Sequence, residues 1–314
     1  MRILITGGFG FIGGRIAAYL SQAGHQVLLG SRNDSSPPVW LPQAEVVKIQ
    51  WGDECAIQSS CEGVDVIVHA AGMNAQDCAA DPIAAYDFNG VATKRLVQAA
   101  SRAGVKKFIY LSTAHVYASP LIGSITEQTL PNNSHPYASS HLVGESAVLN
   151  AHERGVIQGV IMRLSNAYGA PMHKGVNCWM LLVNDLCRQV VQTRKLVLQT
   201  SGLQQRDFVC VSEVCRVTEA LILSNDSTIK PSIFNVGAGI SQSVLEMAVL
   251  IQQRCVLVLG IEPDLEYKKG VANEHLLELS YTSDHLTSIG ISAKSINKTA
   301  EIDRLLEFCR RAFP

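Results

Sequence analysis

The chain has 314 residues, a net charge of -1, 17% charged residues and 47% apolar residues. This composition excludes a disordered chain, and the balanced charge with scattered lysines and arginines excludes a basic nucleic-acid-binding surface. No apolar run reaches membrane-spanning length, and because a strand starts at the first residues we expect no cleaved signal peptide and no membrane contact. The nine cysteines include no Cys-x-x-Cys pair. We therefore expect buried thiols in a cytoplasmic protein, with neither disulfides nor a metal site.

The first 24 residues have the pattern of a strand, a glycine-rich turn and a helix. An apolar run at 3–5 precedes the turn, and an apolar face of helical period follows it as far as Gly24. The first glycine of the turn allows a sharp bend, the second lets the backbone approach a pyrophosphate, and the third lets the helix pack against the sheet. The helix N-terminus then faces the phosphates. The pattern predicts a dinucleotide site that includes Gly7, Gly10, Phe11, Ile12 and Gly13.

The end of the second predicted strand, at 25–29, indicates which dinucleotide binds. An NAD site usually has an acidic residue there to accept hydrogen bonds from the ribose hydroxyls. This chain has Ser31 and Arg32 after Gly30. An arginine beside a hydroxyl suits a 2′-phosphate, so the cofactor is expected to be NADP(H), with NAD(H) as the alternative. Asp53 follows the third predicted strand, at 45–49, and is expected near the adenine.

Strands and helices continue to alternate. Further strands are predicted at 65–69, 108–111 and 156–164, with helices starting at Asp81-Pro82 and at His135-Pro136. This alternation predicts a Rossmann-type α/β fold, with a doubly wound parallel sheet and a ligand at the carboxyl ends of its strands. Residues expected at that edge are Ala70, Ala71, Gly72 and Thr113. Asn89 lies on the first helix, and Tyr137 and His141, four residues apart, share a face of the second.

The pattern changes beyond residue 166. Helices are predicted at 176–191, 213–223, 241–255 and 301–312, and strands at 196–198, 233–236 and 265–269. The strand at 233–236 is expected to return to the main sheet. We therefore predict a nucleotide-binding unit of residues 1–166 plus 207–237, and a smaller, mostly C-terminal substrate-binding region of residues 167–206 plus 238–314.

By its motifs the chain resembles the extended short-chain dehydrogenase/reductases, a group of nucleotide-sugar epimerases, dehydratases and ketoreductases. The motifs are TGGFGFIG at 6–13, HAAG at 69–72, STAHVY at 112–117, YASSH at 137–141, RLSNAYGAP at 163–171, RDFVCVSEV at 206–214 and FNVG at 234–237. The resemblance implies hydride transfer, with Tyr137 as acid or base and Thr113 bonding the same substrate oxygen. It implies substrate contacts from Asn166 and Arg206, a nucleotide-sugar substrate, and a homodimer through the helices that begin at Pro82 and Pro136.

Two positions depart from the family pattern. His141 stands where the family has a lysine that binds the nicotinamide ribose and lowers the tyrosine pKa. Ala114-His115 replaces the Asp-Glu pair of the 4,6-dehydratases, so dehydration is disfavoured, and His115 is either a substrate-side proton donor or a packed loop residue. We expect a ketoreductase or an epimerase. The alternatives are an NADP(H)-binding protein with impaired or lost catalysis, and a ketoreductase of a non-sugar metabolite.

Overall fold

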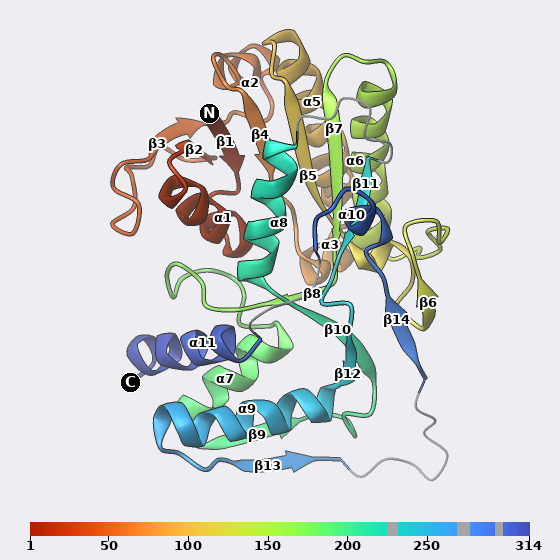
Figure 1. Ribbon diagram of the computed structural model, residues 1–314. Coiled ribbons are helices and arrows are strands. Elements are labelled where there is room, and N and C mark those ends of the chain that lie inside the picture. The colour runs from red at the N-terminus through yellow and green to blue at the C-terminus, as the bar shows by residue number, and fades with distance from the viewer. Residues whose placement is uncertain (225–231, 269–276, 293–297) are drawn as a thin grey trace.

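A seven-stranded parallel sheet forms the centre of the upper half of the molecule (Figure 1). The computed structural model describes residues 1–224, 232–268, 277–292 and 298–314. The strand order is β11-β7-β5-β4-β1-β2-β3, and every neighbouring pair is parallel. The strands are β1 (Arg2–Thr6), β2 (Gln26–Ser31), β3 (Glu45–Lys48), β4 (Val66–His69), β5 (Lys107–Thr113), β7 (Gln158–Leu164) and β11 (Ile233–Val236). This confirms the predicted Rossmann-type sheet, including the return of 233–236.

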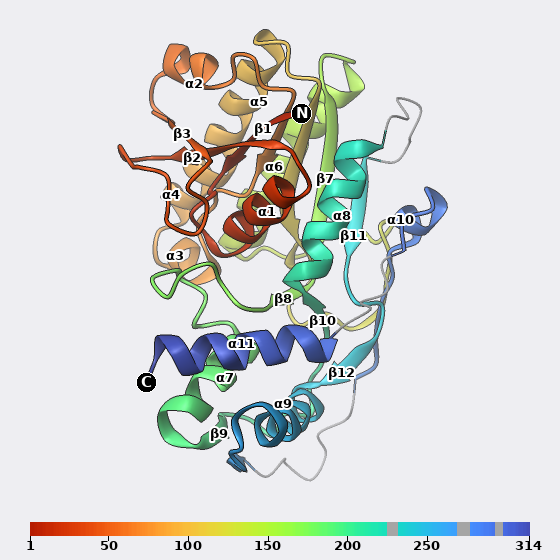
Figure 2. The ribbon, with the colours of Figure 1, turned by 60° about the vertical axis from the view of Figure 1, so that its left-hand side comes forward.

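Helices cover both faces of this sheet because its strands are apolar on both sides. Ile3 and Ile5 of β1 pack in one core cluster with residues of α1 (Phe11–Gln22) and α8 (Val211–Leu223), which lie side by side in Figure 2. Leu4 points to the opposite cluster, which residues of α2 (Glu54–Ser60), α5 (Thr93–Arg102) and α6 (Pro136–Glu153) complete. Alternate residues of one strand thus serve two cores, as expected for a strand buried on both faces.

The helix predicted from Pro82 is divided into three parts. After the short helix α3 (Ala75–Ala80), α4 (Pro82–Ala85) begins with the Asp81 carboxylate accepting from the backbone N–H of Ala84 at 3.0 Å. A π-helical segment, η1 (Tyr86–Ala92), follows and leads into α5. Such segments are found frequently at functional sites, and the periodicity of the sequence does not predict them. Here the π-helical segment contains Asn89, which is buried.

The lower unit has its own small sheets and apolar core. β8 (Asn166–Tyr168), β10 (Gln205–Cys210) and β12 (Ser241–Ser243) form one sheet, and β9 (Lys195–Leu198) pairs with β13 (Asp264–Tyr267). Helices α7 (Leu182–Thr193), α9 (Val244–Leu259) and α11 (Lys298–Ala312) pack around them, below the carboxyl ends of the main strands (Figure 1). The small elements η2 (Ala114–Val116), β6 (Gly123–Ile125), β14 (Leu279–Tyr281) and α10 (Asp284–Ser288) complete the described chain.

Two predicted helix boundaries in this unit are wrong. The helix expected over 176–191 begins only at Leu182, and residues 176–181 form a loop over the cleft. The helix expected to be capped by Ser241 is instead capped by Ser243, whose hydroxyl accepts from the Glu246 N–H while the Glu246 carboxylate accepts from the Ser243 N–H. This reciprocal capping box is a stronger start signal than an isolated serine. Of the strand predicted at 265–269, Lys269 lies outside the described residues.

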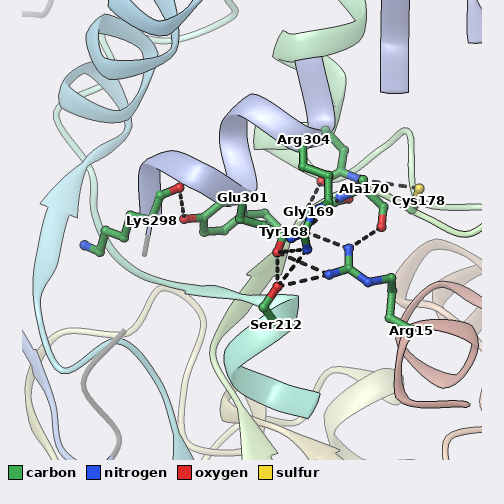
Figure 3. A network of polar contacts seen from close by, with 10 residues as sticks. Arg15, Tyr168, Gly169, Ala170, Cys178, Ser212, Lys298, Glu301 and Arg304 are labelled. Carbon is green, nitrogen blue, oxygen red and sulfur yellow. Dashed lines mark hydrogen bonds and ion pairs between the residues drawn. The ribbon is translucent and has the colours of Figure 1, made fainter. Parts of the chain in front are cut away.

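A buried ion pair joins the two units (Figure 3). Arg15 of α1 donates to Glu301 of α11 over 2.7 Å and to the backbone oxygen of Ala170 over 2.7 Å. Ser212, at the start of α8, also donates to the Glu301 carboxylate, and the Ala170 N–H donates to it over 3.2 Å. Burial alone would raise the pKa of Glu301, but the hydrogen bonds and charge of Arg15 hold it below its usual value. The last helix is therefore fixed to the first.

None of the nine cysteines forms a disulfide; eight of them are buried and Cys55 is exposed. No three His, Cys, Asp or Glu side chains in the described part of the chain are grouped so as to hold a metal ion. None of the helices in that part is both long enough and apolar enough to span a bilayer.

Candidate active site

A cleft of about 940 Å³ opens at the carboxyl ends of the main strands, between the sheet and the lower unit. Parallel sheets of this kind place their ligands there. Most of the residues predicted for the site line this cleft: Gly7, Gly10, Phe11, Ile12, Gly13, Ser31, Arg32, Ala70, Ala71, Gly72, Thr113, His115, Tyr137, His141, Asn166 and Arg206. The fold therefore brings together residues that are distributed along the chain from position 7 to position 206.

The glycine turn forms a backbone cradle that side chains would fill. Gly7 has a φ of +67°, and a Cβ added there would lie 2.8 Å from the backbone nitrogen of Ala71. A Cβ on Gly13 would lie 2.3 Å from the Gly7 carbonyl oxygen. Neither position admits a side chain, and the N-terminus of α1 starts directly after the turn. The residues present fit a dinucleotide pyrophosphate held by backbone N–H groups and the helix dipole.

The end of the cleft beside β2 has serine hydroxyls and a positively charged side chain, that of Arg32. Ser31, Arg32, Asn33 and Ser35 line it. The guanidinium of Arg32 lies 6.0 Å from the ring centre of Phe88. The nearby Asp34 carboxylate does not line the cleft and pairs with Lys48 at 2.7 Å. An anionic group of a ligand at this end could therefore bind Arg32, and among the described residues no carboxylate beside Arg32 lines the cleft to repel it.

Two of the predicted cofactor residues do not line the cleft. The Asp53 carboxylate caps α2 by accepting from the backbone N–H groups of Cys55 and Ala56, at 2.9 and 3.1 Å. Asn89 is buried behind the cleft wall, where its side-chain oxygen accepts from the Met73 N–H at 2.8 Å and its amide donates to Ser140 at 3.0 Å. Asn89 thus holds the loop that follows β4 in place, and Asp53 caps the N-terminus of α2.

Tyr137 and Thr113 meet inside the cleft. Burial raises the pKa of Tyr137 to about 12, although a hydrogen bond with the Thr113 side chain works in the opposite direction. The ring of His115 lies 6.4 Å from that of Tyr137, edge to face. Burial and, after it, the charges of Arg206 and His135 lower the pKa of His115. At neutral pH the site therefore holds a protonated phenol beside an uncharged imidazole.

His141 is the other neighbour of Tyr137, with ring centres 4.6 Å apart. Its Nδ1 lies 2.8 Å from the hydroxyl of Tyr110, a buried residue of β5 that sequence reasoning missed. Burial, with a smaller contribution from His115, lowers the pKa of His141 to about 4. His141 is therefore uncharged at neutral pH and does not replace the charge of a lysine. The sequence does not distinguish Tyr110 from the aromatic side chains that are common in buried strands.

The part of the cleft away from the glycine turn is lined mainly by the lower unit. Asn166 reaches it but donates its amide to the backbone oxygen of Asp207 over 2.9 Å. Arg206 also lines it and bonds the Gln204 side chain at 2.9 Å, whereas Asp207 accepts from Ser165 at 2.5 Å.

Several lining residues were missed by the sequence analysis. They are side chains of the loop at 176–181, of β10 and of the end of the cleft near Arg32, among them Asn177, Met180, Phe208, Trp51 and Phe88. Among them only Trp51, two residues after the strand predicted at 45–49 and directly before Gly52, could have been identified from its place in the sequence. The others lie in segments whose placement over the cleft depends on the packing of the lower unit.

A glycine cradle, a parallel sheet and a tyrosine–threonine pair in one cleft define a dinucleotide-dependent α/β enzyme. The model of the "NAD dependent epimerase/dehydratase family" matches residues 3–237, and the chain belongs to this family of short-chain dehydrogenase/reductase-type enzymes. The resemblance seen in the motifs is thereby confirmed.

Individual relatives have several activities. A dTDP-D-glucose 4,6-dehydratase of Mus musculus is 29% identical over 261 residues, 79% of this chain and 71% of that protein. A dTDP-6-deoxy-L-talose 4-dehydrogenase (NAD(P)(+)) of Kitasatospora kifunensis is 29% identical over 261 residues, 80% of this chain and 78% of that one. A solved UDP-glucose 4-epimerase of Thermus thermophilus, in complex with NAD, superposes with a TM-score of 0.80 at 20% identity, covering 99% of this chain and 100% of that chain. The last similarity concerns the fold.

Proposed function

We propose that this protein is an NADP(H)-dependent reductase of a nucleotide-linked keto sugar, with Tyr137 as the proton donor. The observation that carries the proposal is the pairing of a phenol of raised pKa with an uncharged histidine at the position of the family's lysine. A phenol that stays protonated at neutral pH is suited to donate a proton and poorly suited to remove one.

Reduction of a ketone adds a hydride to carbon and a proton to oxygen, and the nicotinamide coenzyme supplies the hydride. Tyr137 gives its phenolic proton to the carbonyl oxygen, and Thr113 bonds the same oxygen. Epimerases and 4,6-dehydratases must first oxidise a substrate hydroxyl, for which the tyrosine has to act as a base. The charge that would lower its pKa for that step is missing at His141. The absence of a paired acid at Ala114-His115 adds to the case against dehydration, although dehydratases are among the relatives.

The preference for NADP(H) rests on the end of the cleft beside β2. Arg32 and the Ser31 hydroxyl suit a 2′-phosphate, and Asp34 is held by Lys48. The Kitasatospora dehydrogenase, whose name includes NAD(P)(+), is consistent with this, whereas the Thermus structure contains NAD. Replacing Arg32 with Ala should weaken NADPH binding about 10- to 100-fold, the value of a charged hydrogen-bonded contact, and leave NADH unchanged. Arg102→Ala, on the far side of the sheet, is the matched control.

The expected substrate carries a diphosphate. Arg206 and His115 are the basic side chains at the substrate end, and solved neighbours are described in complex with UDP-sugars. In this proposal the upper unit (1–166 plus 207–237) binds the coenzyme and the lower region (167–206 plus 238–314) selects the sugar. If Arg206→Ala has no effect on the binding of any nucleoside diphosphate, a non-sugar ketone becomes the better substrate class.

The deciding experiment follows NADPH oxidation with a panel of nucleoside-diphosphate keto sugars. Tyr137→Phe should lower kcat about 10²- to 10⁴-fold, the usual contribution of a positioned acid, while the coenzyme still binds. Tyr267→Phe, at an exposed tyrosine of β13, should have wild-type activity. Full turnover by Tyr137→Phe would overturn the proposal. A tightly bound NAD in the purified protein, identified by mass spectrometry, would favour an epimerase instead.

A second candidate is a coenzyme-binding protein with impaired chemistry, and the substitution at His141 is the observation in its favour. His141→Lys separates the two. A large gain in turnover would identify the native site as impaired, whereas a loss would identify the histidine as part of a working site. The main proposal also expects a flat activity profile between pH 6 and 8, because neither Tyr137 nor His141 titrates there.

The proposal includes a cytoplasmic homodimer. Eight buried cysteines without a disulfide fit a reducing compartment. Ile83 and Tyr86, on the helical segment that begins at Pro82, are 77% and 52% exposed, which is unusual for large apolar side chains and fits a helix-mediated interface. Light scattering of the purified protein tests the dimer, and Ile83→Glu should shift it towards monomer.

A further inference from the structure

A chain of buried hydrogen bonds lies directly behind the active site, and its proton positions can be assigned. The backbone oxygen of Asn89 can only accept, so the Thr93 hydroxyl donates to it over 2.7 Å. The Thr93 oxygen then accepts from Nε2 of His69, 2.9 Å away. This makes Nδ1 of His69 an acceptor, and the Thr6 hydroxyl donates to it over 2.6 Å. The Thr6 oxygen in turn accepts from the Ala71 N–H at 3.3 Å.

Tyr110 connects this chain to the active site. Its ring stacks on His69 with centres 5.6 Å apart and an interplanar angle of 25°. Its side chain is buried, and its phenolic oxygen packs so closely against Gly144 that a Cβ at that position would lie 2.6 Å from it. That hydroxyl lies 2.8 Å from Nδ1 of His141. Position 110 therefore presents a fixed phenol to one nitrogen of the histidine.

The direction of this last hydrogen bond follows from acid–base strength. The Tyr110 hydroxyl meets two side chains, Thr93 and Nδ1 of His141. A phenol is the most acidic neutral donor in the group, and an uncharged imidazole nitrogen is a stronger acceptor than the Thr93 oxygen, which already accepts from His69. The Tyr110 O–H therefore donates to Nδ1 of His141, and the ring proton of His141 must be on Nε2. Nε2 has no hydrogen-bond partner within the described ranges, and His141 lines the cleft.

We propose that Tyr110 is a positioning residue that fixes His141 as the Nε2–H tautomer and so directs a neutral hydrogen-bond donor into the cleft beside Tyr137. This inference rests on the proposed function for the identity of the ligand. A dinucleotide with its pyrophosphate at the glycine turn and its adenosine at Arg32 would have its second ribose in the part of the same cleft that Tyr137 and His141 line. The hydroxyl oxygens of that ribose are acceptors, and the Nε2–H is the donor that matches them. Residue 141 thus keeps the hydrogen-bonding role at this position without carrying a charge.

The test compares Tyr110→Phe with Tyr117→Phe by two measurements that need no turnover. Tyr117 is a matched control: it is equally buried, and its hydroxyl donates over 2.8 Å to Asn235, away from His141. Nitrogen NMR of ¹⁵N-histidine-labelled, coenzyme-free protein reports which ring nitrogen of His141 carries the proton. Titration with NADPH, and with NADH, reports coenzyme affinity. Wild type and Tyr117→Phe should show a single Nε2–H tautomer and equal affinity.

Tyr110→Phe should give a mixture of tautomers and coenzyme binding weaker by about 5- to 10-fold, the value of one oriented hydrogen bond. In the His141→Lys background the same change should have little effect, because an ammonium carries donors in every orientation. A purely structural role for Tyr110 would lower stability in both backgrounds and leave the tautomer and the affinity unchanged.

An Nδ1–H tautomer in the wild type would overturn the inference even if the protein reduces keto sugars. The expected tautomer and affinities in a protein that reduces no keto sugar would instead refute only the proposed function.

Discussion

The molecule contains two buried polar networks that are stabilised in opposite ways. The junction network, made of Arg15, Ala170, Ser212, Glu301 and Arg304, holds a full ion pair whose members are 11% and 2% exposed. The site network, made of Thr6, His69, Thr93, Tyr110 and His141, contains only neutral groups joined by hydrogen bonds. A buried charge must be paired to offset its desolvation, whereas a neutral group needs a hydrogen-bond partner only. The first network should therefore be sensitive to the loss of a partner, and the second to protonation.

The largest effect is expected from breaking the ion pair. Glu301→Ala leaves the Arg15 guanidinium buried without its main partner, which should lower the free energy of unfolding by about 3–5 kcal/mol. Denaturant unfolding at pH 7 measures this. Arg15 and Glu301 come from α1 and α11, so the same variant should loosen α11 in hydrogen exchange (Figure 3). A loss below about 1 kcal/mol would show that the pair is not required for stability.

Acidification should act first on the site network. Burial lowers the pKa of His69 to about 3 and that of His141 to about 4, whereas an unfolded histidine has a pKa of about 6.5. The unfolded chain therefore binds more protons below pH 6.5, so stability is complete above that value and is lost as the pH falls towards 4. Each histidine should contribute roughly 1–3 kcal/mol to this loss, whereas the Glu301 contribution fades only below its own unfolded pKa of about 4.3.

The measurement is the free energy of unfolding at intervals from pH 7 to pH 5. His141→Asn should reduce the slope in this window, and His135→Asn, at an exposed histidine, should not. A stability that is constant between pH 7 and 5 would contradict the assignment of neutral, buried histidines.

A smaller effect is expected at the centre of the site network. Thr93→Val keeps the shape of the side chain but removes the acceptor for His69 and the donor to Asn89, and should cost about 1–3 kcal/mol. Thermal unfolding at pH 7 checks this, and Thr299→Val, at an exposed position of α11, is the comparison for the substitution itself. An unchanged midpoint for Thr93→Val would show that the hydrogen bonds of Thr93 do not stabilise the site network.

The smallest effect is expected for an ion pair in water. Lys195 and Glu266 lie 2.6 Å apart, with side chains 48% and 51% exposed. Glu266→Gln should leave the unfolding midpoint within experimental error, because water and salt screen such a pair. Together with Glu301→Ala this variant separates the contribution of burial from that of the ionic contact.

The sequence alone predicted most of the upper unit, with the π-helical segment at Tyr86–Ala92 as the exception. The strand, glycine turn and helix of residues 1–24, the alternation of strands and helices, and the return of 233–236 to the sheet all follow from periodicity and local turn chemistry. The same local signals put Gly7 and Gly13 in the cradle and Tyr137 and His141 on one helix face. Local patterns are reliable here because the central strands are buried on both faces and the glycine turn requires a particular residue type.

Tertiary structure determined the rest, because the relevant contacts join residues far apart in the chain. Asp53 follows a predicted strand, where an acidic residue can bind a ligand, but its carboxylate caps the adjacent helix α2. The helix expected from residue 176 starts later because residues 176–181 pass over the cleft. Most of all, the consequence of His141 depends on Tyr110, 31 residues earlier on a central strand. Only the packing of α6 on β5 brings the two rings together in a dry environment, where burial sets the charge and a single hydroxyl sets the tautomer.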